Sequence, residues 1–254
     1  MSQIVTRTVR LLALGAIIAA PVSAQQPAAA SLPSAQDLHA LYVKAMGGAD
    51  VIKKHASMHF TGKFEVPAAG MSGNVESWNS DGKLLTVIEF PGIGQIRTGF
   101  DGITAWQIHP AQGPMLLTGK QLDQIKQQSD LQAVLTPDKY VKTRETVEKT
   151  SFGGKDAYKV KIVLHNGEEY FEFYDVSTAL NIGSIRKTET PMGAIDATSI
   201  ITEYKTFDGQ QVPTQMKQSA MGVEQVVSVT NMMFMPVDKA TFDLPKEIKA
   251  LTGK

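Results

Sequence analysis

Hydrophobic and polar residues alternate along most of the chain after residue 57, with the period of a β-strand that buries one face. In the first such segment Met58, Phe60 and Phe64 share one side, and polar residues occupy most of the other. Turn signals such as Asp81-Gly82 and Asn166-Gly167 separate the segments. The pattern predicts strands over residues 58–66, 74–80, 83–90, 93–100, 103–109, 158–164, 169–175, 181–188, 197–206, 212–220 and 223–234, with a charged segment at 141–150 as a further candidate.

Other segments have helical spacing. Ser34 is a suitable N-cap for a helix that ends at Gly47-Gly48, a second helix is expected over residues 118–135, and a short one ends near residue 251. One side of the second helix carries leucine and isoleucine, and the other is rich in glutamine. Before it, Pro110 and Pro114 disfavour a central strand. The segment 110–117 is therefore expected to be a loop, either a lid over a curved sheet or a plug in its core.

These elements predict a mainly β protein with a few helices. Ten or eleven strands with turns every 8–12 residues are typical of an antiparallel sheet that is closed or curled on itself. Strands and helices do not alternate in βαβ units, which disfavours a Rossmann fold or a TIM barrel. No linker divides the chain, so residues 34–254 are expected to form a single domain.

The N-terminal segment has the pattern of a secretory signal. Arg7 and Arg10 precede ten apolar residues, and Val22-Ser23-Ala24 supplies small residues at the spacing of a signal-peptidase site. A transmembrane helix needs about 20 apolar residues, so this stretch is too short to be one. We expect a cleaved signal peptide at 1–24, a disordered leader at 25–33, and a soluble periplasmic protein rather than an integral membrane protein.

Composition narrows the classes of function. The chain has 254 residues, with 25 lysines and arginines against 25 aspartates and glutamates, so no net charge attracts it to nucleic acid. It contains no cysteine. That excludes disulfides, cysteine nucleophiles, thiolate metal sites and a lipidated N-terminal cysteine.

The residues that carry chemistry are scattered. His55 and His59 are four apart, but His59 lies in a predicted strand, where such a spacing does not suit a metal, so we expect solvated surface histidines and no metal site. Acidic residues gather at Glu168, Glu169, Glu172 and Asp175, where the hairpin pattern favours a solvated face. No nucleophile and base can be paired, and no nucleotide motif is present. We therefore expect no catalysis and no cofactor.

Methionine is unusually frequent, with 11 residues. Its flexible, polarisable side chain suits a surface that receives varied apolar ligands, and it also fills gaps in ordinary cores. Both interpretations stay open from the sequence.

A series of short motifs, in this order, resembles the LolA/LppX-like superfamily of outer-membrane lipoprotein-sorting proteins, periplasmic lipoprotein carriers and mycobacterial lipid-binding lipoproteins. The resemblance extends from Ser34 to the C-terminus. The motifs are Gly99–Trp106 with Pro110 and Gly113-Pro114, Gly154–Tyr158, Tyr174-Asp175, Glu203-Tyr204, Phe207–Gly209, Val212-Pro213 and Phe242–Pro245.

The resemblance implies a strongly curved, incomplete antiparallel β-barrel of about eleven strands, with helices over its concave face and an apolar cavity for acyl chains. The leading hypothesis is thus a periplasmic carrier or binding protein for a lipid or an acylated lipoprotein, with envelope membrane proteins as further partners. The candidate cavity and lid residues are Met58, Phe60, Phe64, Ile88, Phe100, Trp106, Ile108, Met115, Leu116, Leu122 and Ile125, with Phe171, Phe173, Met216 and Met233 as weaker candidates.

Two alternatives stay open. One is a sensory or structural module of the cell envelope that binds a protein partner through its curved sheet. The other is a periplasmic hydrolase whose site is too dispersed to recognise in the sequence.

Overall fold

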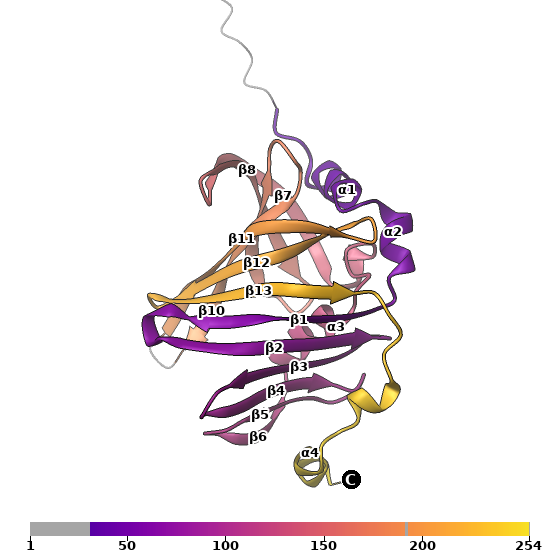
Figure 1. Ribbon diagram of the computed structural model, residues 1–254. Coiled ribbons are helices and arrows are strands. Elements are labelled where there is room, and N and C mark those ends of the chain that lie inside the picture. Colours follow the sequence, from indigo (N-terminus) through magenta and orange to yellow (C-terminus); the bar gives the residue numbers. More distant parts are fainter. Residues whose placement is uncertain (1–30, 191–192, 254) are drawn as a thin grey trace, which may run out of the picture. The chain divides into compact units, whose positions relative to one another are not determined.

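Antiparallel strands form one continuous sheet in the computed structural model, which describes residues 31–190 and 193–253 (Figure 1). The predicted signal peptide, 1–24, lies outside the described residues, as do residues 25–30 of the predicted leader. From Leu32 onward the chain forms one compact unit. The strands are β1 (Ser57–Val66), β2 (Met71–Ser80), β3 (Lys83–Phe90), β4 (Gly94–Phe100), β5 (Ala105–His109), β6 (Gly113–Leu117), β7 (Val141–Phe152), β8 (Lys155–Leu164), β9 (Glu169–Asp175), β10 (Asn181–Thr190), β11 (Gly193–Phe207), β12 (Gln210–Ala220) and β13 (Val223–Met233).

The order of the strands is β6-β5-β4-β3-β2-β1-β13-β12-β11-β10-β9-β8-β7, and every neighbouring pair is antiparallel. The chain starts in the middle at β1 and runs outward to β6. It then crosses to the opposite edge at β7 and returns strand by strand to β13 beside β1. Because β6 and β7 do not pair, the curved sheet stays open, which confirms the predicted fold class.

The described residues contain thirteen strands, two more than the upper count of eleven. One is β7, the charged segment. The other is β6, which replaces the loop expected over 110–117, so this segment is neither a lid nor a plug. Pro114 is tolerated there because β6 is an edge strand. An edge strand has a neighbour on one side only, so a residue without a backbone N–H need not cost an inter-strand hydrogen bond.

Four α-helices accompany the sheet: α1 (Ala35–Ala45), α2 (Ala49–Lys54), α3 (Lys120–Ser129) and α4 (Lys246–Thr252). Short 3₁₀ helices are η1 (Pro67–Ala69), η2 (Pro137–Lys139) and η3 (Lys239–Phe242). The N-cap prediction for Ser34 is confirmed, because its Oγ accepts a hydrogen bond from the backbone N–H of Asp37 at 3.0 Å.

Helix α3 is shorter than the predicted 118–135 helix, and Asp130 is the reason. The Asp130 carboxylate accepts from the backbone N–H of Gln132 at 3.1 Å, from Tyr140 Oη at 2.8 Å and from Lys139 Nζ at 2.7 Å. A side chain that bonds the backbone two residues on stabilises a turn in place of the next helical bond. The chain therefore leaves the helix at Ser129 and continues through turns to η2.

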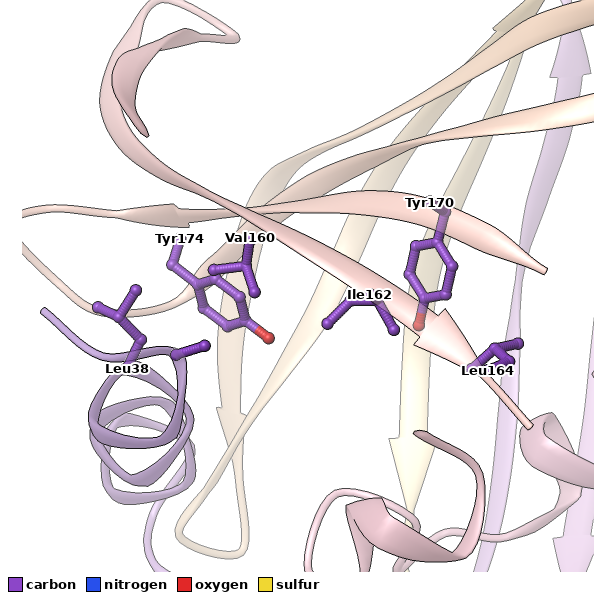
Figure 2. Packing of buried hydrophobic residues seen from close by; sticks show 7 residues of the cluster. Leu38, Val160, Ile162, Leu164, Tyr170 and Tyr174 are labelled. Carbon is purple, nitrogen blue, oxygen red and sulfur yellow. The ribbon is translucent and has the colours of Figure 1, made fainter. Parts of the chain in front are cut away.

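Two buried clusters hold α1 and α3 on one face of the sheet. Under α3, the cluster contains Leu84, Phe100, Ala105, Leu117 and Ile125, with Met115 and Leu122 packed against it. Under α1 it contains Ala35, Leu38, Val160, Ile162, Leu164, Tyr170 and Tyr174 (Figure 2). A third cluster, Phe152, Ala157, Phe173 and Ile182, lies on the opposite face of β7 to β10.

The C-terminal helix should contribute to stability through one side chain. Ile248 of α4 is 0% exposed and α4 contacts β6, whereas Leu251 on the same helix is 48% exposed. We expect Ile248→Ala to lower the free energy of unfolding by about 2–5 kcal/mol. Leu251→Ala should change it by no more than about 0.5 kcal/mol. Urea unfolding followed by circular dichroism measures both, and equal effects would show that α4 does not dock as described.

Candidate functional site

The segment that connects β6 to β7 lies inside the curve of the sheet. Its helix α3 contacts β3 and β4, while Gln127, Ala133 and Val134 also border strands from the other half of the sheet. Only the concave face allows one short segment to reach both halves. In Figure 1, α3 lies behind the central strands. Two cavities remain between this segment and the sheet, and those three residues line both.

The larger cavity, here called the large chamber, has a volume of about 700 Å³. It lies between the segment 124–134 and strands β10 to β13, and its lining mixes polar and apolar groups. The resemblance implied an apolar cavity. The apolar residues are Met46, Leu131, Ala133, Val134, Ala197, Met216, Ala220 and Val223; the polar ones include Gln124, Gln127, Gln128, Asp130, Ser184, Arg186, Ser199, Gln218 and Gln225.

Strand register explains which residues face the large chamber. Ser184 of β10 is opposite Ser199 of β11, Ser199 is opposite Gln218 of β12, and Gln218 is opposite Gln225 of β13; all four line the chamber. Directly opposed residues share a face of the sheet. The register therefore carries one row of inward side chains across all four strands.

Arg186 is held in a fixed position at this wall. Its Nη1 lies 3.1 Å from Glu168 Oε1, and its guanidinium carbon lies 3.5 Å from the centre of the Tyr170 ring. Glu168 is only 9% exposed, and its Oε2 has no hydrogen-bond partner among the described residues. The expectation of a solvated acidic face is therefore wrong at Glu168, and also at Asp175, which is 5% exposed. Residues 168, 170, 172 and 174 all point into the curve, where neighbouring elements cover them.

The smaller cavity, here called the small chamber, has a volume of about 210 Å³. It lies between α1, strands β7 to β9 and residues 133–141. Figure 2 shows Tyr170 and Tyr174 on the same side of the strands as Val160 and Ile162, with Leu38 of α1 beside Tyr174. The principal lining residues are His39, Tyr42, Gln127, Val134, Tyr140, Arg144, Val160, Ile162, Tyr170, Glu172 and Tyr174.

Glu172 is the acidic group of the small chamber. Its carboxylate accepts a hydrogen bond from Tyr174 Oη at 2.5 Å and a longer one from Tyr170 Oη at 3.3 Å. Burial, and then the charge of Glu172, raises the pKa of both tyrosines. Burial likewise raises the pKa of Tyr42. The phenols consequently stay protonated and neutral at physiological pH.

His39 contributes a neutral ring to the same chamber. Its Nε2 lies 2.8 Å from the carbonyl oxygen of Val134 and donates to it. Burial holds the pKa of His39 below its ordinary value, an effect that outweighs the backbone hydrogen bond. The imidazole therefore carries no charge at neutral pH.

The structure brings some of the predicted residues to the concave face. Met216 lines the large chamber, and Met58 lines an adjoining hollow of about 70 Å³ that shares Met46 and Leu131 with it. Phe60, Phe64 and Ile88 lie on the same face by register. Phe100, Met115, Leu122 and Ile125 also lie there, but they pack α3 onto the sheet.

Six predicted residues lie on the opposite face: Trp106, Ile108, Leu116, Phe171, Phe173 and Met233. Trp106 packs over Gly99, where an added Cβ would lie 2.3 Å from the indole, and Arg97 lies 5.5 Å from its ring centre. Phe173 stacks on Phe152 at 3.8 Å. Side chains alternate between the two faces of a strand, so a wrong prediction of the inward face misplaces every side chain of that strand.

The small chamber was missed at the sequence level. The sequence pattern that indicates it is the alternation of Tyr170, Glu172 and Tyr174 with Phe171 and Phe173. Greater hydrophobicity favours the phenylalanines as the inward set. Both faces of this strand are covered, so hydrophobicity did not distinguish them.

His55 is not the surface histidine that was expected. It is 4% exposed and stacks on Phe234 with 3.5 Å between ring centres. Its Nδ1 lies 2.6 Å from Gln210 Oε1, and its Nε2 lies 3.1 Å from Asp208 Oδ2. His59 likewise is largely covered, and it bonds Glu76 at 2.8 Å. Within the described ranges, no three histidine, aspartate or glutamate side chains group as a metal site.

Comparison with known proteins defines the fold. Neither a protein-family model nor a curated protein matches the sequence. Among solved structures, a DUF1329 family protein from Desulfovibrio piger matches with TM-score 0.56 and 13% identity, over 82% of this chain and 96% of that one. A LolA superfamily protein from Nitrosomonas europaea matches with TM-score 0.56 and 14% identity, over 84% and 99%.

A third similar structure is a putative outer membrane lipoprotein-sorting protein domain from Vibrio parahaemolyticus. It has TM-score 0.50 and 12% identity, over 78% of this chain and 97% of that one. The chain therefore shares its fold with these structures, one of which is a LolA superfamily protein, as the resemblance of the sequence motifs predicted. In the part of the chain that the structure describes, no helix has the length and apolar character that crossing a membrane requires.

The lowered pKa of His39 predicts a pH-dependent stability. Between the folded pKa and the ordinary value, the unfolded chain binds more protons, so the free energy of unfolding falls as the pH falls through this window. We expect His39→Gln, whose amide can still donate to Val134, to lose less stability than the unchanged protein between pH 7 and pH 5. Urea unfolding at several pH values measures this. Identical slopes for the two proteins would contradict the burial of a neutral imidazole.

Proposed function

We propose that the protein is a non-catalytic periplasmic carrier or binding protein that holds a lipid or an acylated ligand in the large chamber. The observation that carries this proposal is the cavity of about 700 Å³ between the crossing segment and β10 to β13. Its volume falls within the range of about 300–1,000 Å³ that is usual for small-molecule sites. The predicted signal peptide and the LolA superfamily fold support the location and the class of ligand.

The lining of the large chamber suits a flexible amphipathic ligand. Met46 and Met216 lie at two of its walls, and their unbranched side chains adapt to chains of different shape. Each buried methylene of an acyl chain contributes about 0.8 kcal/mol. The amide groups of Gln124, Gln127 and Gln128 provide partners for ester or amide groups of the same ligand.

A pair of methionine substitutions tests this proposal. Met216 lines the chamber, whereas Met233 is 42% exposed on the opposite face. We expect Met216→Glu to weaken uptake of a fluorescent fatty acid by at least about tenfold, because a carboxylate that loses its water against an acyl chain costs more than about 1.4 kcal/mol. Met233→Glu should leave uptake unchanged. Titration of the purified mature protein, followed by fluorescence, measures both.

Native mass spectrometry of protein purified from its own cell envelope provides an independent test. A copurifying acyl species that organic solvent extracts would support the carrier. Protein that is always recovered empty, and that takes up neither fatty acid nor phospholipid, would exclude it.

A further inference from the structure

Two opposite charges line the small chamber without pairing with each other. Glu172 projects from β9 and Arg144 from β7, and neither forms an ion pair with any residue that the structure describes. Strand β8 lies between them, which separates the two backbones by roughly 10 Å. The carboxylate and the guanidinium therefore belong to different walls of one cavity.

The surroundings of Glu172 suit a cation. The hydrogen bonds that its carboxylate accepts come from neutral phenols, so they leave its charge uncompensated. Tyr42 and Tyr174 add aromatic rings to the same lining, whereas Lys139 already lies 5.1 Å from the ring centre of Tyr140. Ammonium groups bind favourably over such rings, most strongly where water is excluded. One face of Tyr170 is already occupied by Arg186 and is not available.

Arg144 provides the matching site for an anion. A guanidinium presents five N–H donors and binds phosphate through paired hydrogen bonds. The remaining titratable side chains of the lining are the neutral His39 and the protonated tyrosines. The chamber thus offers one positive and one negative group to its occupant.

We propose that the small chamber recognises a zwitterionic head group, with an ammonium group beside Glu172 and a phosphate beside Arg144. This inference rests on the proposed function. The acyl part of the same lipid would lie in the large chamber, and Gln127, Ala133 and Val134, which line both chambers, mark where the head group would join its chains. A phospholipid of the ethanolamine or choline type has this chemistry, whereas an anionic phospholipid leaves Glu172 unmatched.

The test compares short-chain phospholipids that share the same acyl chains. The mature protein is titrated with phosphatidylethanolamine, phosphatidylcholine and phosphatidylglycerol in competition with a fluorescent fatty acid. We expect the two zwitterionic lipids to bind at least about tenfold more tightly than the glycerol lipid, which corresponds to about 1.4 kcal/mol. Equal affinities would overturn the head-group inference and leave the carrier proposal intact. No binding of any lipid would overturn the carrier proposal itself.

Matched variants assign the preference to Glu172. Glu172→Gln should remove the preference for the zwitterionic lipids while fatty-acid binding persists. Glu169→Gln changes a carboxylate on the same strand that faces outward and pairs with Lys161 at the surface, so it should keep the preference. If Glu172 serves only to hold the tyrosines, both variants will retain the preference, and the inference fails.

A separate binding measurement tests the role of Arg144. Arg144→Gln should weaken binding of all three phospholipids but not of a diacylglycerol with the same chains, whereas the exposed Lys142→Gln on the same strand should change neither. Free phosphocholine separates the lipid from a soluble source of the same chemistry. Phosphocholine that competes as strongly as the intact lipid would contradict the lipid assignment. Should Glu172→Gln fail to fold in urea-unfolding measurements, the lipid series on the unchanged protein still decides.

Discussion

The structure depends on one topological constraint: two strands that follow each other in the chain, β6 and β7, lie at opposite edges of the sheet. The chain leaves the sheet at β6 and re-enters it at β7, twelve strand positions away in the order. A segment of 23 residues, 118–140, makes this crossing. In a curved sheet the short route between the edges passes through the concave side. The crossing therefore fills part of the interior and divides what remains into the two chambers.

The amphipathic character of α3 determines the chemistry of those chambers. Leu122 and Ile125 turn toward the cluster on β3 to β6, where burial of apolar surface stabilises the crossing. Gln124, Gln127 and Gln128 then necessarily face the other half of the sheet. The large chamber is consequently amphipathic rather than purely apolar. Asp130 ends the helix and turns the chain toward β7, which places Ala133 and Val134 where they border both chambers.

Much of the fold followed from local patterns. Alternation and turn signals located eleven strands, and Ser34 located the first helix. The edge strand β6 was missed because Pro114 excludes only a central position, and whether a strand is central depends on partners that are distant in sequence. Local patterns predicted the candidate site less well than the fold. Met216 and Met58 line cavities, but Trp106, Phe171 and Phe173 lie on the other face, and the small chamber with its charged side chains was not recognised.

The sequence by itself determined which side chains lie together, since the period of two in a strand places Tyr170, Glu172 and Tyr174 on one face and Phe171 and Phe173 on the other. Only the tertiary structure decided which of these sets lines a cavity. Hydrophobicity identifies the inward face when the other face is in water, but both faces of β9 are covered. Where burial is similar on the two sides, the inward set is decided by the curvature of the sheet and by the path of the crossing, and these arise from contacts between distant parts of the chain.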